Sequence, residues 1–102
     1  MNQPALFDIV ELLVDLPEDN LKAGDRGTIV ECYNDNAYEI EFTNSEGETI
    51  ALCTLSLQQF VTVWQAKTKS WLSLSEQITA IVKNLDLEYQ KEVFKFARSL
   101  HN

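Results

Sequence analysis

The chain has 102 residues, enough for one domain with a modest core, because a chain of this size buries roughly two thirds of the surface that it exposes when unfolded. Its formal net charge is -8, and the charges are unevenly placed. Residues 1–64 hold twelve Asp and Glu against two Lys and Arg, a balance of -10, and residues 65–102 hold four against six, a balance of +2. Because a balance of -10 repels phosphate groups, we do not expect residues 1–64 to bind nucleic acid.

The cellular compartment is indicated by the targeting and membrane segments that we do not find and by the two cysteines. The sequence shows no charged-then-apolar leader and no apolar run of about 20 residues, so we expect no signal peptide, no membrane span and a cytoplasmic protein. Cys32 and Cys53 fall within strand patterns, and the register given below places them two strand spacings apart, roughly 10 Å. A disulfide needs Cα atoms within about 7 Å, so we expect two buried free thiols, which fit a reducing cytosol.

Five short runs with β-forming residues follow one another in the first two thirds of the chain. A long loop containing Pro17 separates the first two, an Asn-Asp-Asn turn joins the next two as a hairpin, and Gly47 supplies the following turn. The expected strands are 7–14, 27–33, 37–42, 48–54 and 60–64. The long first loop and the single tight turn at 56–59 before the last strand favour an SH3-like antiparallel barrel over residues 1–64.

Side-chain parity predicts the two faces of the middle sheet, because a one-residue slip turns every side chain to the other face. We pair Cys32 with Tyr38 and Phe42 with Thr49. The core-facing set is then Val30, Cys32, Tyr38, Ile40, Phe42, Ala51 and Cys53. The outward set is Ile29, Glu31, Glu39, Glu41, Ile50 and Leu52. This acidic face with an apolar margin is either a solvated surface or a docking surface that the tail or a partner covers.

A polar linker at 65–72 and two amphipathic helices are expected after the barrel. Ser73 and Glu76 form a capping box for a helix ending near Asn84, and Asp86 caps a second helix ending near Leu100. Their apolar stripes are Leu74, Ile78, Ile81 and Leu85, and Tyr89, Val93, Phe96 and Leu100. The sequence therefore predicts an α+β protein in which a helical hairpin, residues 73–102, follows the barrel.

The two stripes must be buried, because helices this short are marginal alone in water. They pack on each other and on the barrel, in the groove of a partner, or in a dimer seam. We predict a homodimer formed through the hairpin. The alternative is a monomer whose tail wraps over Ile29, Ile50 and Leu52.

Catalytic chemistry is not indicated. The one histidine, His101, stands next to the last residue, where chains usually fray, so no nucleophile and base pair can be built. A carboxylate pair such as Glu39 with Glu41 needs a pocket to separate the two pKa values, and alternating Glu on a strand is typical of a solvated face. We expect no enzyme activity, no cofactor and no metal. Trp64 and Trp71 either cover the bottom of the barrel or form an aromatic ligand platform.

Four stretches between residues 7 and 64 carry a family resemblance. They are 15–18 (Asp-Leu-Pro-Glu), 22–31 (Lys-Ala-Gly-Asp-Arg-Gly-Thr-Ile-Val-Glu), 38–42 (Tyr-Glu-Ile-Glu-Phe) and 47–55 (Gly-Glu-Thr-Ile-Ala-Leu-Cys-Thr-Leu). Through them the chain resembles an uncharacterised bacterial family of small SH3-like proteins, a domain of unknown function. Residues 24–42 also look like the barrel half of nitrile hydratase β subunits, but no metal-centre residues accompany that half, so the activity does not carry over.

The tail carries a second resemblance. Residues 85–93 (Leu-Asp-Leu-Glu-Tyr-Gln-Lys-Glu-Val), within 78–100, are similar to a two-helix segment of antitoxin-related proteins. Together the resemblances imply a non-catalytic protein-binding module of the antitoxin or immunity type, and the -10 balance favours a basic protein partner. The second hypothesis is a structural or accessory subunit of a larger enzyme or complex. The candidate partner-binding residues are Glu31, Glu39, Glu41, Ile50, Leu52, Tyr89, Val93, Phe96 and Leu100.

Overall fold

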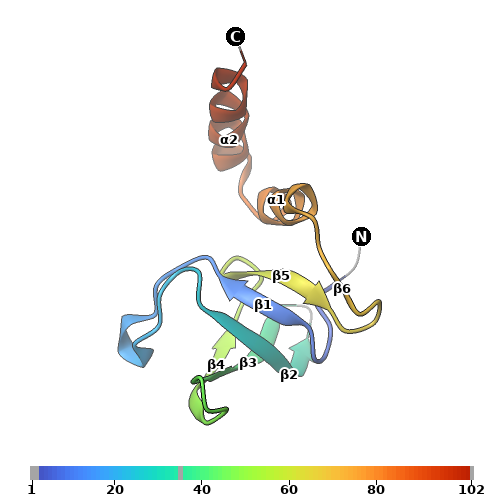
Figure 1. The fold of residues 1–102 in the computed structure, drawn as a ribbon. Coiled ribbons are helices and arrows are strands. Elements are labelled where there is room, and N and C mark those ends of the chain that lie inside the picture. The colour runs from blue at the N-terminus through green and yellow to red at the C-terminus, as the bar shows by residue number, and fades with distance from the viewer. Residues whose placement is uncertain (1–2, 35, 102) are drawn as a thin grey trace.

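The computed structural model of the protein describes residues 3–34 and 36–101 and has an α+β fold, a six-stranded antiparallel sheet followed by two helices (Figure 1). The strands are β1 (Ile9–Leu12), β2 (Arg26–Asn34), β3 (Ala37–Thr43), β4 (Thr49–Leu55), β5 (Phe60–Gln65) and β6 (Ser70–Trp71). A 3-10 turn, η1 (Pro17–Asp19), lies between β1 and β2, and the helices are α1 (Leu74–Lys83) and α2 (Leu87–Ser99). Among the described residues, neither helix has the length and apolar content needed to cross a membrane.

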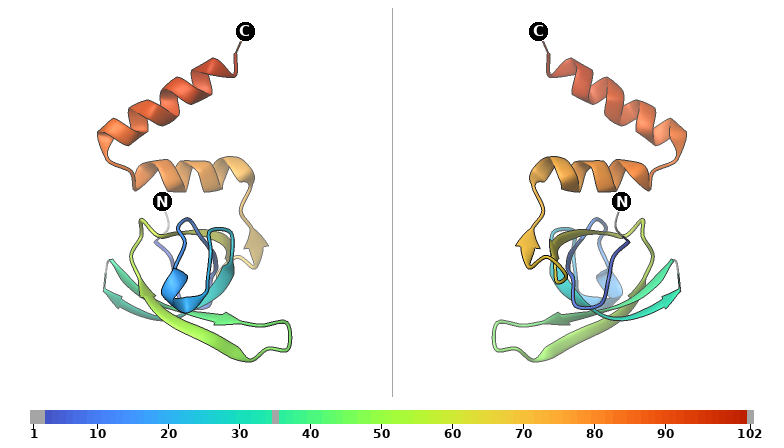
Figure 2. Two further views of the ribbon diagram at one scale, coloured as in Figure 1. Left: turned by 90° about the vertical axis from the view of Figure 1, so that its left-hand side faces the viewer. Right: turned by 90° about the vertical axis from the view of Figure 1, so that its right-hand side faces the viewer.

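The sheet is open, so the prediction of a closed five-stranded barrel is wrong. Its strand order is β4-β3-β2-β1-β5-β6, which leaves β4 and β6 at the two edges. The tight turn at 56–59 carries the chain from one edge strand across to β5, which pairs with β1 and β6 instead of with β4. The sheet curls strongly, and its inner face encloses the core (Figure 2). The buried apolar side chains of this core come from five strands and the first loop: Val10, Leu12, Leu21, Ile29, Tyr38, Ile40, Phe42, Cys53, Leu55 and Phe60.

All five predicted strands are present, within a few residues of their expected bounds. The sixth strand, β6, lies inside the stretch 65–72 that we expected to be a linker, and it pairs with β5 through Trp64 opposite Trp71. A strand of two residues is too short to show an alternating pattern in the sequence. Of the Asn34–Asn36 turn that joins β2 to β3, residue 35 lies outside the described residues.

A bulge in β2 changes the predicted faces of the sheet. Cys32 pairs with Tyr38, as predicted, but Ile29 pairs with Ile40, and the ladder shifts by one residue at Val30. An extra residue on one strand reverses the parity of everything beyond it. Ile29 is therefore in the core, with 0% of its surface exposed, and its predicted outward position is wrong. Val30, predicted to face the core, is only half-buried.

A second shift lies between β3 and β4. Phe42 pairs with Ala51 rather than with Thr49, and Ile50 is the extra residue. The predicted register of β4 therefore differs from the observed one by two residues. A shift of two residues leaves every side chain on the same face, so Phe42 and Ala51 both face the core, as predicted. Phe42 is fully buried and Ala51 is partly buried against the core, while Ile50 stays 54% exposed.

The two cysteines are both free, as predicted, but only one of them is buried. Cys53 lies in the core, where its Sγ donates a hydrogen bond to Asp19 Oδ2 at 3.5 Å. Burial first, and then the hydrogen bond and charge of Asp19, raise the pKa of Cys53 to about 11. The prediction of a buried Cys32 is wrong, because β2 runs beyond the core at its hairpin end and leaves Cys32 and the residues after it exposed.

The helices begin where the sequence predicts. Ser73 Oγ accepts a hydrogen bond from the backbone N–H of Glu76 at 3.1 Å, and Glu76 Oε1 accepts one from Ser73 N–H at 2.8 Å. This capping box holds the pKa of the Glu76 carboxyl below its usual range. Asp86 occupies the N-cap position of α2, although its side chain makes no capping hydrogen bond. Helix α1 lies over β5, and α2 projects away from the sheet (Figures 1 and 2).

The bulge at Val30 leads to different predictions for two isoleucines that we expected on the same face of the sheet. Ile29→Ala should lower the free energy of unfolding by about 2–5 kcal/mol, because it leaves a cavity in the core. The matched control Ile50→Ala removes the same atoms from an exposed site and should change stability by no more than about 0.5 kcal/mol. Urea unfolding followed by tryptophan fluorescence measures both, and equal losses would contradict the register of β2.

The two thiols should react at very different rates. With an uncharged disulfide reagent near neutral pH, Cys32 of the native protein should react, though more slowly than an ordinary exposed thiol, because desolvation and the charge of Glu31 raise its pKa. Cys53 should not react until the protein is denatured. Cys32→Ser should remove the native reaction altogether, whereas Cys53→Ser should leave it intact. Two rapidly reacting thiols in the native wild-type protein would show that Cys53 is not enclosed.

Candidate functional site

Three glutamates form the centre of the outer face of β2 and β3. Glu31 lies directly opposite Glu39, as predicted, and Glu41 follows two residues along β3. Like charges directly across a ladder destabilise the pair, so this arrangement is unfavourable unless other groups compensate it. The outer face therefore carries a concentrated negative charge that an opposite charge would relieve.

Hydroxyl groups from neighbouring strands hold two of these carboxylates in place. Glu39 Oε1 accepts hydrogen bonds from Tyr33 Oη at 3.0 Å and from Thr54 Oγ1 at 2.8 Å. Thr49 Oγ1 donates to Glu41 Oε2 in the same way. The bond to Glu39 raises the pKa of the Tyr33 hydroxyl, because its proton is shared with a carboxylate. These contacts orient the charges along the sheet.

An apolar margin lies beside the charges. Leu52 pairs with Glu41 across the β3–β4 ladder and is 58% exposed, and Ile50 adjoins it on the same strand. The five candidate residues on the sheet are thus brought together by the structure. We call this set the acidic face: Glu31, Glu39, Glu41, Ile50 and Leu52.

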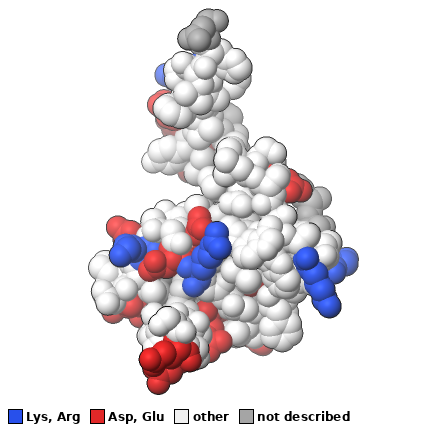
Figure 3. Space-filling view, in the orientation of Figure 1, with Lys and Arg blue, Asp and Glu red and all other residues white. Residues whose placement is uncertain are grey.

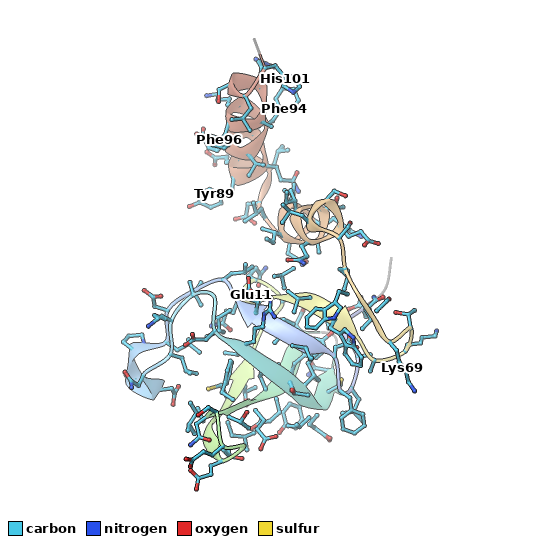
Figure 4. All side chains as sticks on the ribbon, in the orientation of Figure 1. Glu11, Lys69, Tyr89, Phe94, Phe96 and His101 are labelled. Carbon is cyan, nitrogen blue, oxygen red and sulfur yellow. The ribbon has the colours of Figure 1, made fainter. Side chains whose placement is uncertain are left out.

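The candidate residues of the tail lie elsewhere. Tyr89, Phe96 and Leu100 are exposed on α2 and Val93 is half-buried there, and the side chains of Tyr89 and Phe96 stand away from the sheet (Figure 4). The strands of the acidic face are at the opposite end of the molecule from the helices (Figure 2). On the face drawn in Figure 3, acidic atoms gather near the β3–β4 turn, whereas few charged atoms are visible at the helical end. The two halves of the predicted site are therefore two separate surfaces.

A cleft of about 470 Å³ lies between α1 and β5, and it contains two carboxylates. Asp8 is buried and accepts backbone hydrogen bonds from Ala5 N at 3.0 Å and Ala66 N at 2.9 Å. Glu76 is held by the capping box. Both carboxylates accept hydrogen bonds from backbone N–H groups, which stabilises the fold around the cleft. No sequence pattern singles out Asp8, because its two donors, Ala5 and Ala66, come from opposite ends of the sheet domain.

The two tryptophans form a cluster on β5 and β6, in which Trp71 is exposed and Trp64 is half-buried. Their ring centroids are 6.5 Å apart at 62°, and the Arg26 guanidinium lies 5.3 Å from the Trp71 ring centroid. Arg26 Nε also contacts Glu11 Oε1 at 3.2 Å, beside β1 (Figure 4). Neither tryptophan belongs to the core cluster, so the pair is an aromatic surface rather than a cover for the core. In residues 3–34 and 36–101, no three His, Cys, Asp or Glu side chains are grouped as a metal site requires.

Comparison with known proteins places the sheet within a family. A family model described as a domain of unknown function, DUF4926, matches residues 6–62, which is more than half of the chain. The match begins before β1 and ends within β5, so β6 and both helices lie outside it. No curated protein and no solved structure matches the chain. The chain therefore belongs to the DUF4926 family.

Proposed function

We propose that the protein is a non-catalytic protein-binding module whose acidic face binds a basic protein, as a neutraliser of the antitoxin or immunity type would. The observation that carries this proposal is the row of glutamates, oriented by hydroxyl donors and open on a sheet face with apolar neighbours. Lys or Arg side chains of a partner would relieve the repulsion between Glu31 and Glu39. The excess of ten negative charges in residues 1–64 would also speed the encounter with a basic partner.

The apolar margin offers such a partner apolar contacts in addition to charge. Exposed ion pairs alone contribute little to affinity, and interfaces are usually stabilised by a few apolar anchors that exclude water. Leu52 and Ile50 are placed to be those anchors, beside the glutamates. A partner that places basic side chains opposite the glutamates, and apolar side chains one strand spacing from them, would match this face.

Structural observations also support three further parts of the proposal, which concern the relationship of the fold, the absence of catalysis and the cellular location. The pairing of β1 with both β2 and β5, the long β1–β2 loop and the tight turn before β5 favour an SH3-like relation for the open sheet. The engaged carboxylates of the cleft favour a binding role over a catalytic one. The exposed free thiol of Cys32 favours a cytoplasmic location, where thiols remain reduced.

A second candidate function is an accessory subunit of a larger complex. The exposed apolar side chains of α2 favour it, because an amphipathic helix that nothing covers can lie in the groove of a partner. An interface of this kind would be apolar and would resist salt, whereas binding through the acidic face would weaken as salt rises.

Two double substitutions with the same change of charge test the acidic face. Glu39→Gln with Glu41→Gln should reduce the capture of basic proteins from native cells by at least tenfold at low salt, because the charges that face the partner are lost. The control, Glu46→Gln with Glu48→Gln, removes two charges from the β3–β4 turn and should reduce capture only slightly. Affinity purification at low and high salt, quantified by mass spectrometry, measures both variants.

The supporting result is one stoichiometric basic partner that is lost at high salt and in the Glu39/Glu41 variant. A small basic protein encoded beside this chain is the first one to co-express and purify with it. A partner that persists at high salt and in both variants would contradict binding through the acidic face and would favour the accessory subunit.

A further inference from the structure

Helix α2 carries an apolar side that nothing in the described part of the chain covers. At 100° per residue, Tyr89, Val93, Phe96 and Leu100 fall within one narrow arc, and the charged side chains fall opposite them. The charged arc consists of Glu88, Lys91, Glu92, Lys95 and Arg98. No residue of α2 is buried, and Phe96 and Leu100 are 67% and 69% exposed. Helix α2 therefore has an apolar side, but no other described part of the chain packs against that side.

Helix α1 also has exposed apolar side chains. Its residues that line the cleft, such as Glu76, Thr79 and Lys83, face β5. Leu74 and Ile78 lie on the opposite side of the helix, away from the sheet, and Leu74 is 72% exposed. Of the four residues of the predicted stripe, Leu74 and Ile78 thus point away from the sheet, and Ile81 and Leu85 are half-buried. We call the exposed apolar side chains on these two stripes the tail surface: Leu74, Ile78, Tyr89, Phe96 and Leu100. Phe94 lies on the other side of α2, where the Arg98 guanidinium is 4.7 Å from its ring centroid.

We propose that the tail surface of one copy is covered by the tail surface of a second copy. These large apolar side chains are about half exposed or more and each offer roughly 100 Å², so the five of them offer about 500 Å² per copy. Stable specific interfaces bury about 800 Å² per partner. The tail surface of each copy therefore supplies more than half of the area that a stable dimer needs.

The placement of charge favours a second copy over a basic partner at this surface. Residues 65–102 have a balance of +2, so a basic protein has no electrostatic reason to approach them. The charged arc of α2 contains both signs, with Glu88 four residues before Glu92 and Lys91 four residues before Lys95. Two such helices packed antiparallel can place glutamates of one copy beside lysines of the other at the rim of the contact.

The same dimer keeps the acidic regions apart. The molecule is 47 Å long in its longest direction, and the acidic face and the helices are at opposite ends (Figures 2 and 3). Contact through the tails leaves the two acidic sheets separated by far more than the Debye length of about 8 Å. Contact through the sheets would instead bring two balances of -10 together. A symmetric dimer through the tails is thus the pairing that the charge distribution permits.

A dimer of this form presents two acidic faces that point away from each other. It would bind two copies of a basic partner, or one partner with two basic sites, and linked sites of this kind gain affinity through effective concentration. The dimer itself does not depend on the proposed function. Its formation is a property of the tail surface alone.

Light scattering on the full chain tests the dimer. Wild type should have twice the chain mass from low to high micromolar concentration, and Phe96→Asp should have the mass of one chain, because it places a charge in the seam. The matched control, Ser99→Asp, adds the same charge on the polar side of α2 and should remain a dimer. Glu39→Gln with Glu41→Gln should also remain a dimer, so that failure of the acidic-face proposal and failure of this one can be told apart.

Circular dichroism gives a second reading that does not depend on a variant that folds poorly. Because a helix of 13 residues is marginal alone, the helical signal of wild type should fall on dilution while the β-sheet signal stays constant. A wild-type monomer at high micromolar concentration would overturn the proposal. So would a dimer that survives Phe96→Asp, or one that Ser99→Asp disrupts equally.

Discussion

The bulge at Val30 is the local feature on which the arrangement of the central strands depends. It lets Ile29 pair with Ile40 facing the core, while Glu31 pairs with Glu39 facing outward. Without the extra residue, the ladder that starts at Cys32 would carry Ile29 to the outer face, and the core would lose one of its fully buried side chains. The bulge therefore lets one strand contribute Ile29 to the core and, two residues later, Glu31 to the acidic face.

A buried carboxylate joins the beginning of the chain to the base of the tail. Asp8 accepts hydrogen bonds from Ala5 and Ala66, which lie before β1 and in the turn between β5 and β6. Burying a carboxylate is costly unless hydrogen bonds satisfy it, and here both oxygens have a donor. Because β6 follows this turn and leads directly into α1, the contact holds the point from which the helices leave the sheet.

Charge and apolar surface are separated along the molecule. The acidic face lies on the family domain, and the tail surface lies on the helices that follow the family match. A basic partner at one end and a second copy at the other would not compete for space. Residues 1–64 have a charge balance of -10 and residues 65–102 a balance of +2, and these two parts of the sequence also lie at different ends of the molecule.

Features that depend on a few neighbouring residues could be predicted from the sequence. Turn residues and alternating patterns located five strands, and the capping box at Ser73 and Glu76 located the start of α1. The opposition of Glu31 and Glu39 also followed, because the hairpin turn lies close to both. These features were predictable because hydrogen bonding and side-chain period act over short distances along the chain.

The tertiary structure alone decided which of these residues are covered. Ile29 is buried and Cys32 exposed because burial depends on which other strands reach that part of β2, and a bulge can change the answer without any mark in the pattern. Asp8 became a structural contact only when two turns distant in sequence met beside it. Leu74 and Ile78 of α1 face away from the sheet because the chain leaves β6 in a direction that the periodicity of the helix does not specify. Periodicity shows that a helix has an apolar side, and only the packing of the whole chain determines what that side meets.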